Sequence, residues 1–282
     1  LYFDSDSDIT VSFTAQVTID KDITIENRGA GTVTFDGQSN TRLLTIDSSS
    51  TVILDNVALI NGYDIANGGA IYNEGILTLQ NTYAPDEMIS LSGHSTGGYG
   101  GFLYNIGTVS ISGNSYYTNN TSIGDGGVFY NEGILTIDGA IFETNGTGSA
   151  NGGVIYNTAI LDVLDSSFSD NYATGSGVSI YNDSTGNVSI DGSNFTNHSD
   201  DDNSIIYTNQ GALSIKRSNF TDNLNRSIYS NNSSSFVISE SLFENNTIAG
   251  NGGAIEAKGS GTINYSQFIN NNITGNFDDG GA

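Results

Sequence analysis

The chain has no cysteine and no tryptophan, and its 282 residues include one proline and one methionine. Without cysteine it can form no disulfide, no thiolate nucleophile and no thiolate metal site, and cysteine usage says nothing about its compartment. No apolar run approaches the roughly 20 residues that span a bilayer. No signal peptide is recognisable, so we expect either a mature chain or a fragment.

Positive charge is also scarce. Thirty-one acidic residues against seven basic ones give a net charge of −24, and no Lys or Arg lies between Arg42 and Lys216. Proteins that bind nucleic acid neutralise phosphates with Lys and Arg, and anionic membrane surfaces attract the same residues. We therefore expect no nucleic-acid partner and no direct membrane insertion of this segment.

What the chain does contain is an internal repeat. Residues 68–79 read GGAIYNEGILTL and residues 126–137 read GGVFYNEGILTI, 58 positions apart. Tyrosines recur at intervals of 22 to 32 residues, at Tyr72, Tyr104, Tyr130, Tyr156, Tyr181, Tyr207 and Tyr229. A second aromatic series recurs at intervals of 23 to 27 residues, at Tyr117, Phe142, Phe168, Phe195, Phe220, Phe243 and Phe268. Periods of this length are typical of solenoids.

Each repeat unit holds three short segments of alternating apolar residues, separated by Gly, Asn, Asp and Ser, which favours three strands and three turns. We predict an all-β, right-handed parallel β-helix with three strands per rung and about ten rungs. Equivalent residues should stack in columns about 4.8 Å apart, and we count the Tyr, Leu/Val and Phe columns as its buried core.

The whole chain, residues 1–282, is predicted to be one β-helix domain. Residues 1–62 form irregular N-terminal rungs and residues 63–282 the regular repeats. Because solenoids need polar caps and none is recognisable, we expect a segment of a longer surface protein.

Two kinds of polar position have a structural interpretation. An Asn follows the repeated Tyr at Asn73, Asn105, Asn131, Asn157 and Asn182. Asn tolerates the left-handed backbone of a sharp turn, and a column of amides can hydrogen-bond from rung to rung. Glycine pairs precede the same strand at 68–69, 100–101, 126–127, 152–153 and 252–253. These pairs predict a tight corner with positive φ.

GGAI at Gly68–Ile71 and Gly252–Ile255 accompanies a second motif, F-x-x-N, at Phe142, Phe168, Phe220, Phe243 and Phe268. Together they resemble the polymorphic outer-membrane-protein repeat of bacteria and the adhesin-like surface proteins of methanogenic archaea. The resemblance covers roughly residues 50–282 and departs from the pattern at His198, where Asn is expected. The lack of cysteine favours the archaeal group. The resemblance implies an extracellular cell-surface adhesin whose partner is a glycan or protein of another cell.

Residues 80–100 lengthen one rung, and loops that project from a repetitive fold often bind partners. The candidate binding residues of this insertion are Tyr83, Pro85, Asp86, Glu87, Met88, His94 and Tyr99. The two histidines of the chain, His94 and His198, are expected at the surface.

Two other function classes compete with adhesion. Many parallel β-helices cleave polysaccharides, and Asp200, Asp201 and Asp202 with nearby His198 form the densest acidic cluster. An inverting hydrolase needs two carboxylates separated by about 6.5–9.5 Å. The Gly-His-Gly and Arg-x-Lys motifs of β-helical galacturonases are missing, so we predict no catalytic residue. The third class is a purely structural stalk.

We predict no cofactor, with calcium as the one alternative. Its candidate oxygen ligands are Asp4, Asp6 and Asp8 near the start and Asp278 and Asp279 near the end of the sequence. Asn-x-Ser/Thr sequons suggest a glycoprotein. They occur at Asn119, Asn120, Asn145, Asn182, Asn187, Asn194, Asn197, Asn219, Asn225, Asn231, Asn232, Asn245, Asn264 and Asn272.

Overall fold

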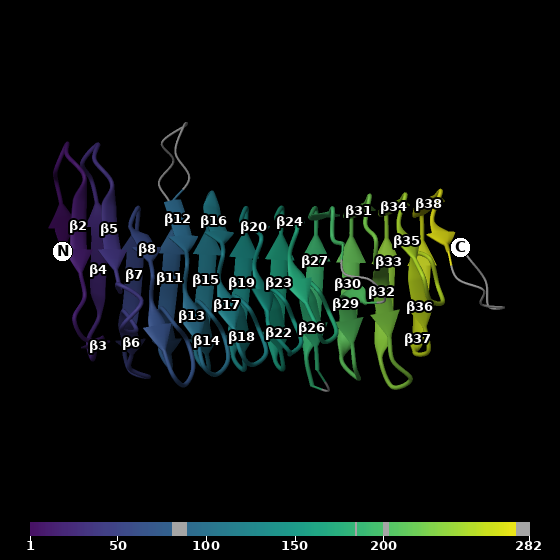
Figure 1. The fold of residues 1–282 in the computed structure, drawn as a ribbon, viewed down its shortest axis with the longest axis horizontal. Helices are drawn as coiled ribbons and strands as arrows, with labels where there is room; N and C mark the ends of the chain where they lie inside the picture. Colours follow the sequence, from purple (N-terminus) through teal and green to yellow (C-terminus); the bar gives the residue numbers. More distant parts are fainter. Residues whose placement is uncertain (81–88, 184, 200–202, 275–282) are drawn as a thin grey trace.

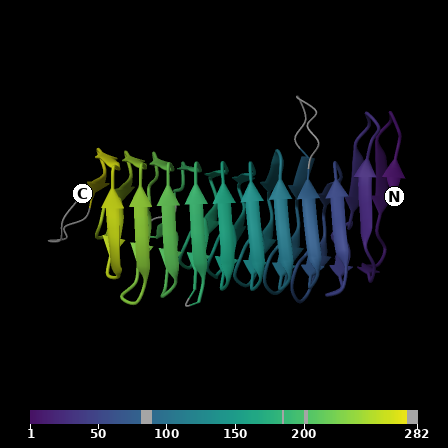
Figure 2. The same cartoon turned by 180° about the vertical axis from the view of Figure 1, so that it is seen from behind.

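The computed structural model describes residues 1–80, 89–183, 185–199 and 203–274. Within these ranges the chain forms β-strands and no helix, and hence no helix that could cross a membrane. The strands wind about one axis into an elongated rod with the two termini at opposite ends (Figure 1). Figure 2 shows the same stack from behind. The chain is a parallel β-helix, as predicted.

Three long sheets run along the rod, and all their strand pairs are parallel. Sheet A contains β1 (Tyr2–Phe3), β4 (Ile23–Asn27), β7 (Thr51–Asp55), β11 (Ile76–Gln80), β15 (Thr108–Ser112), β19 (Ile134–Asp138), β23 (Ile160–Leu164), β27 (Asn187–Asp191), β30 (Ala212–Lys216), β33 (Ser235–Ser239) and β37 (Ser260–Asn264). Sheet B contains β2 (Ile9–Ser12), β5 (Val33–Asp36), β8 (Ala58–Ile60), β12 (Ile89–Ser92), β16 (Ser115–Thr118), β20 (Ile141–Glu143), β24 (Ser167–Ser169), β28 (Asn194–Thr196), β31 (Asn219–Thr221), β34 (Leu242–Glu244) and β38 (Gln267–Ile269).

Sheet C contains β3 (Val17–Ile19), β6 (Leu44–Ile46), β10 (Ile71–Asn73), β14 (Leu103–Asn105), β18 (Phe129–Asn131), β22 (Ile155–Asn157), β26 (Ile180–Asn182), β29 (Ser204–Thr208), β32 (Arg226–Ser230) and β36 (Ile255–Ala257). Two-residue strands form a short sheet D of β9 (Tyr63–Asp64), β13 (Ser95–Thr96), β17 (Thr121–Ser122), β21 (Gly146–Thr147) and β25 (Tyr172–Ala173), and a pair of β35 (Thr247–Ile248) and β39 (Asn272–Ile273). The irregular first rungs pair into the same three long sheets as the regular repeats.

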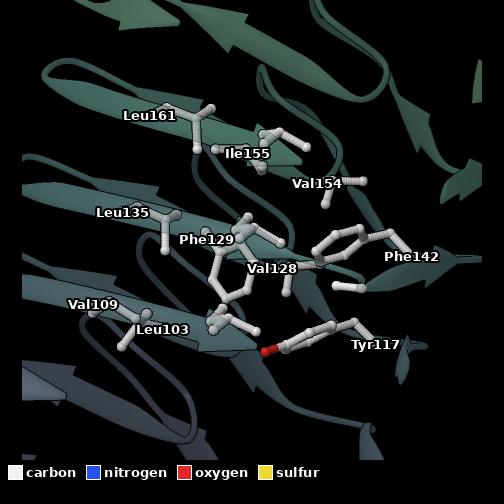
Figure 3. Packing of buried hydrophobic residues seen from close by; sticks show 14 of the residues in the cluster. Leu103, Val109, Tyr117, Val128, Phe129, Leu135, Phe142, Val154, Ile155 and Leu161 are labelled. Carbon is white, nitrogen blue, oxygen red and sulfur yellow. The ribbon is translucent and has the colours of Figure 1, made fainter. Parts of the chain in front are cut away.

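Alternation within each strand separates the core from the surface. In β19, Leu135 and Ile137 are buried, whereas Ile134 and Asp138 are exposed. Successive side chains of a strand point to opposite faces, so one face of every strand lines the interior. Figure 3 shows this interior, with Val109, Leu135 and Leu161 stacked on one side.

The Phe column is buried, as predicted. Phe168 and Phe220 have no exposed side-chain surface. Ring centroids of neighbouring rungs lie 4.7–4.9 Å apart from Tyr117 to Phe268, with planes within 20° of parallel. Each ring therefore covers the next, in keeping with the rung spacing.

The Tyr column lies on the outside, and its assignment to the core was wrong. In β18 (Phe129–Asn131), Phe129 and Asn131 point inward, and Tyr130 between them points outward. A buried Asn is acceptable here because an amide in the next rung satisfies it.

The Asn residues after these tyrosines form an internal amide ladder, as expected. Nδ2 of Asn105 donates to Oδ1 of Asn131 at 2.8 Å, and Nδ2 of Asn131 donates to Oδ1 of Asn157 at 2.7 Å. The left-handed backbone that we expected at these positions is wrong, because none of the five Asn residues has a positive φ. They are the last residues of strands in sheet C rather than turn residues.

The glycine pairs form the predicted corner. The first Gly of each pair has a positive φ, for example +67° at Gly68 and +73° at Gly126. The second is needed for space, since a Cβ on Gly127 would lie 2.1 Å from the carbonyl oxygen of Gly153. In two of the rungs that lack the pair, β29 and β32 begin earlier and extend to five residues.

Candidate functional site

The outward side of sheet C carries a continuous ladder of seven tyrosines, from Tyr72 to Tyr229. Neighbouring ring centroids lie 4.7–5.3 Å apart and the ring planes are within 10° of parallel. Because each ring face is covered by its neighbour, the ladder presents ring edges and hydroxyl groups to solvent, except at Tyr156, which is only 9% exposed. We call this ladder, together with Tyr99, Asp125, Glu132 and Asp183, the tyrosine face.

Carboxylates bind two of the phenols from the following rung. Tyr104 Oη donates to Glu132 Oε2 at 2.6 Å, and Tyr156 Oη donates to Asp183 Oδ2 at 2.8 Å. Each acceptor stands two positions after the Tyr of its own rung, so the pattern Tyr-Asn-Asp/Glu signals the pair in the sequence. We missed this signal because we had placed the tyrosines inside.

The phenols of Tyr104, Tyr156 and Tyr181 remain protonated donors at neutral pH. Partial burial raises the pKa of Tyr104 and Tyr156 far above the ordinary phenol value, and the nearby carboxylates raise it further. The same causes raise the pKa of Tyr181 to about 12. Burial also raises the pKa of Asp125, while hydrogen bonds from Asn151 oppose the shift.

Both ends of the ladder are covered by the protein's own cations. Arg42 lies over the outer face of Tyr72, with 5.4 Å from Cζ to the ring centroid, and pairs with Asp64 at 3.0 Å. At the other end, Arg226 and Lys258 lie 5.5 and 5.1 Å from the centroid of Tyr229. These cation–π contacts occupy the terminal ring faces.

Tyr99 is the one ring of this face that departs from the stack. Its centroid lies 4.8 Å from that of Tyr130, but its plane is tilted by 38° and its side chain is 40% exposed. Tyr99 therefore presents part of a ring face to solvent. It is also the predicted binding residue that the structure places on this surface.

The structure describes only one other residue of the predicted binding loop, His94. Tyr83, Pro85, Asp86, Glu87 and Met88 lie outside the described residues. The expectation of surface histidines is wrong, since His94 and His198 are completely buried.

Both histidines occupy a second internal column, three positions after the Phe column. We call it the asparagine column: His94, Asn120, Asn145, Asn171, His198, Asn223, Asn246 and Asn271. For His198 the sequence showed the substitution within F-x-x-N. For His94 the motif was hidden, because Leu91 aligns with Tyr117 in the register of β12 and β16.

The structure gives no support for the alternative catalytic site or the alternative calcium sites. Asp200, Asp201, Asp202, Asp278 and Asp279 lie outside the described residues. Asp4, Asp6 and Asp8 are exposed, and Asp8 Oδ1 accepts the backbone N–H of Thr32 at 2.8 Å. Across residues 1–80, 89–183, 185–199 and 203–274, no three His, Asp or Glu side chains converge on a metal position.

The sequons divide by burial. Asn120, Asn145, Asn182 and Asn225 are fully buried, so a glycan on any of them is incompatible with the folded rung. The other ten predicted acceptors are partly or fully exposed. The glycoprotein hypothesis therefore rests on those ten positions.

An apolar cavity of about 300 Å³ opens at the N-terminal end of the core, where Phe3, Phe13 and Phe35 contribute to its lining.

Comparison with protein-family models, characterised proteins and solved structures gives no match to this chain.

Proposed function

We propose that this chain is a segment of a cell-surface adhesin and that its tyrosine face binds an extended glycan of another cell or of a host surface. The observation that carries the proposal is the row of phenols at 4.7–5.3 Å intervals with carboxylate partners. Such a row offers a repeating partner a phenol in every rung, with a carboxylate beside the phenols of Tyr104 and Tyr156. Exposed Tyr99 adds an apolar surface on which a sugar ring can pack.

The charge of the tyrosine face indicates which class of glycan it binds. Each of the seven basic side chains lies in an ion pair with a carboxylate. The central tyrosine face instead carries Asp125, Glu132 and Asp183. Acidic polysaccharides are therefore repelled, and neutral or amino sugars are favoured. Partners on this surface are cell-surface glycans rather than nucleic acid.

A glycan array with neutral, amino-sugar and uronic-acid polymers tests the proposal. We expect binding to neutral or amino-sugar polymers that Tyr99→Ala reduces at least tenfold and Tyr104→Phe reduces several-fold. Tyr104→Phe keeps the ring stack and removes only the hydroxyl that donates to Glu132. The matched control is Tyr116→Phe, because Tyr116 donates to Glu143 in the same way but from sheet B.

The same experiment separates the alternatives. Release of shortened products from any polymer would identify a polysaccharide-cleaving enzyme and overturn the adhesin. Equal loss of binding in the Tyr116→Phe control would place the binding surface elsewhere. Absence of binding to every glycan and to intact cells would leave a structural stalk.

A further inference from the structure

The asparagine column shows what a side chain must do to occupy it. Asn145 Oδ1 accepts the backbone N–H of Asn120 at 3.1 Å, and its Nδ2 donates to the carbonyl of Tyr117 at 2.8 Å. Asn223 does the same one rung after His198, with the N–H of His198 and the carbonyl of Phe195. In the rungs that carry Asn, the position therefore requires one acceptor and one donor, both directed at the preceding rung.

His94 meets this requirement as a neutral imidazole. Its Nδ1 accepts the backbone N–H of Gly62 at 2.8 Å, and its Nε2 lies 2.9 Å from the carbonyl oxygen of Leu59. An amide N–H can only donate and a carbonyl can only accept. These partners therefore assign the proton to Nε2 and leave a lone pair on Nδ1.

A second proton on His94 has no acceptor. It would place an N–H at Nδ1 directly against the N–H of Gly62, two donors at 2.8 Å. Gly62 is buried and has no side chain that could rotate to compensate. An unpaired buried donor costs free energy, and a buried charge costs more.

No neighbouring charge offsets this cost. The described groups in contact with the ring are the backbone of Leu59 and Gly62 and the ring of Phe102 at 5.1 Å between centroids, while Asn120 Oδ1 accepts the backbone N–H of His94. None of them titrates. Burial, opposed only by the hydrogen bond to Leu59, lowers the pKa of His94 to about 4.

His198 is held differently. Its Nδ1 lies 3.1 Å from Asn223 Oδ1, which assigns the proton to Nδ1, and its Nε2 lies 2.8 Å from the hydroxyl of Ser179. That hydroxyl can rotate and accept a hydrogen bond from a protonated Nε2. Both N–H groups of a charged His198 then find acceptors, whereas a charged His94 leaves one unsatisfied.

We propose that His94 is an acid-sensitive joint that uncouples the rung ending at Gly62 from the rungs that follow it. Above the ordinary imidazole pKa, His94 is neutral and its two hydrogen bonds hold the rungs together. The folded chain binds fewer protons there than the unfolded chain, so the coupling weakens as the pH falls from about 6.5 towards 4. An adhesin carrying this joint would loosen its N-terminal rungs in acid, though the joint itself does not depend on the proposed function.

The chain supplies its own matched variant. His94→Asn restores the residue that the column uses in most rungs, retaining the acceptor and the donor and removing the titration. Backbone amide hydrogen exchange of residues 58–64 at pH 7 and pH 4.5, corrected for intrinsic exchange, reports local opening. We expect protection of the Gly62 amide to fall about fifty-fold in the wild type on acidification. It should change less than threefold in His94→Asn, with His198→Asn behaving as the wild type.

Equal acid loss in the wild type and His94→Asn would overturn the proposal and assign the effect to other titrating groups, either the carboxylates or His198, whose pKa burial also lowers to about 4. Unchanged protection in the wild type would overturn it as well. If His94→Asn folds poorly, imidazole ¹⁵N spectra of the wild type decide instead. A neutral Nε2–H tautomer of His94 that persists down to pH 5 supports the joint, and ordinary titration near pH 6.5 contradicts it.

Discussion

The interior Phe column and the exterior Tyr ladder run along the same rod with nearly the same stacking geometry. Ring centroids are 4.7–4.9 Å apart inside and 4.7–5.3 Å apart outside. The common spacing follows from the strand separation, which imposes one repeat on every column. The two columns differ in solvent exposure, because the rings from Tyr117 to Phe243 are completely buried, whereas most of the outer tyrosines are partly exposed. Stacking geometry alone therefore says little about how strongly a column stabilises the fold.

The largest expected effect is on the inside. Phe220→Ala removes a completely buried ring that is stacked between Phe195 and Phe243. We expect a loss of about 3–5 kcal/mol in the free energy of unfolding, measured by urea denaturation at pH 7. A loss below about 1.5 kcal/mol would mean that neighbouring rungs collapse into the space.

An intermediate effect is expected at the amide ladder of sheet C. Asn131→Ala removes the acceptor of Asn105 Nδ2 and the donor to Asn157 Oδ1 in a fully buried column. Leaving buried partners unsatisfied costs about 1–3 kcal/mol, measured by the same denaturation. Asn131→Asp should cost more, because it retains the acceptor towards Asn105 but places an ionisable carboxyl against the oxygens of Asn157 and Ile160.

The smallest effect is expected on the outside. Tyr181→Phe removes a partly exposed hydroxyl and keeps the ring between Tyr156 and Tyr207. The free energy of unfolding should change by less than about 1 kcal/mol. A loss as large as that of Phe220→Ala would contradict the comparison and make the outer ladder as important for stability as the core.

Local sequence was sufficient for the features that depend on the repeat. The recurrence of GGAIYNEGILTL predicted parallel rungs, and F-x-x-N predicted a buried aromatic column. The glycine pairs predicted positive φ because Gly, which has no Cβ, enters that backbone region at no steric cost. The ion pairs at the ladder ends could not be predicted from local sequence, because Arg42 and Asp64 come together only through the winding of the chain.

The sequence by itself determined the period, the strand class and the glycine corners, because these follow from alternation and from turn residues that act over a few positions. Only the tertiary structure decided which way each strand faces and where the histidines lie. In Ile-Tyr-Asn, burial of Ile and Asn is favourable only when another Asn, 25 to 32 residues away, satisfies the amide. His94 is buried for a similar reason: its hydrogen-bond partners, Gly62 and Leu59, lie 32 and 35 residues earlier and reach the ring only after the rungs have stacked.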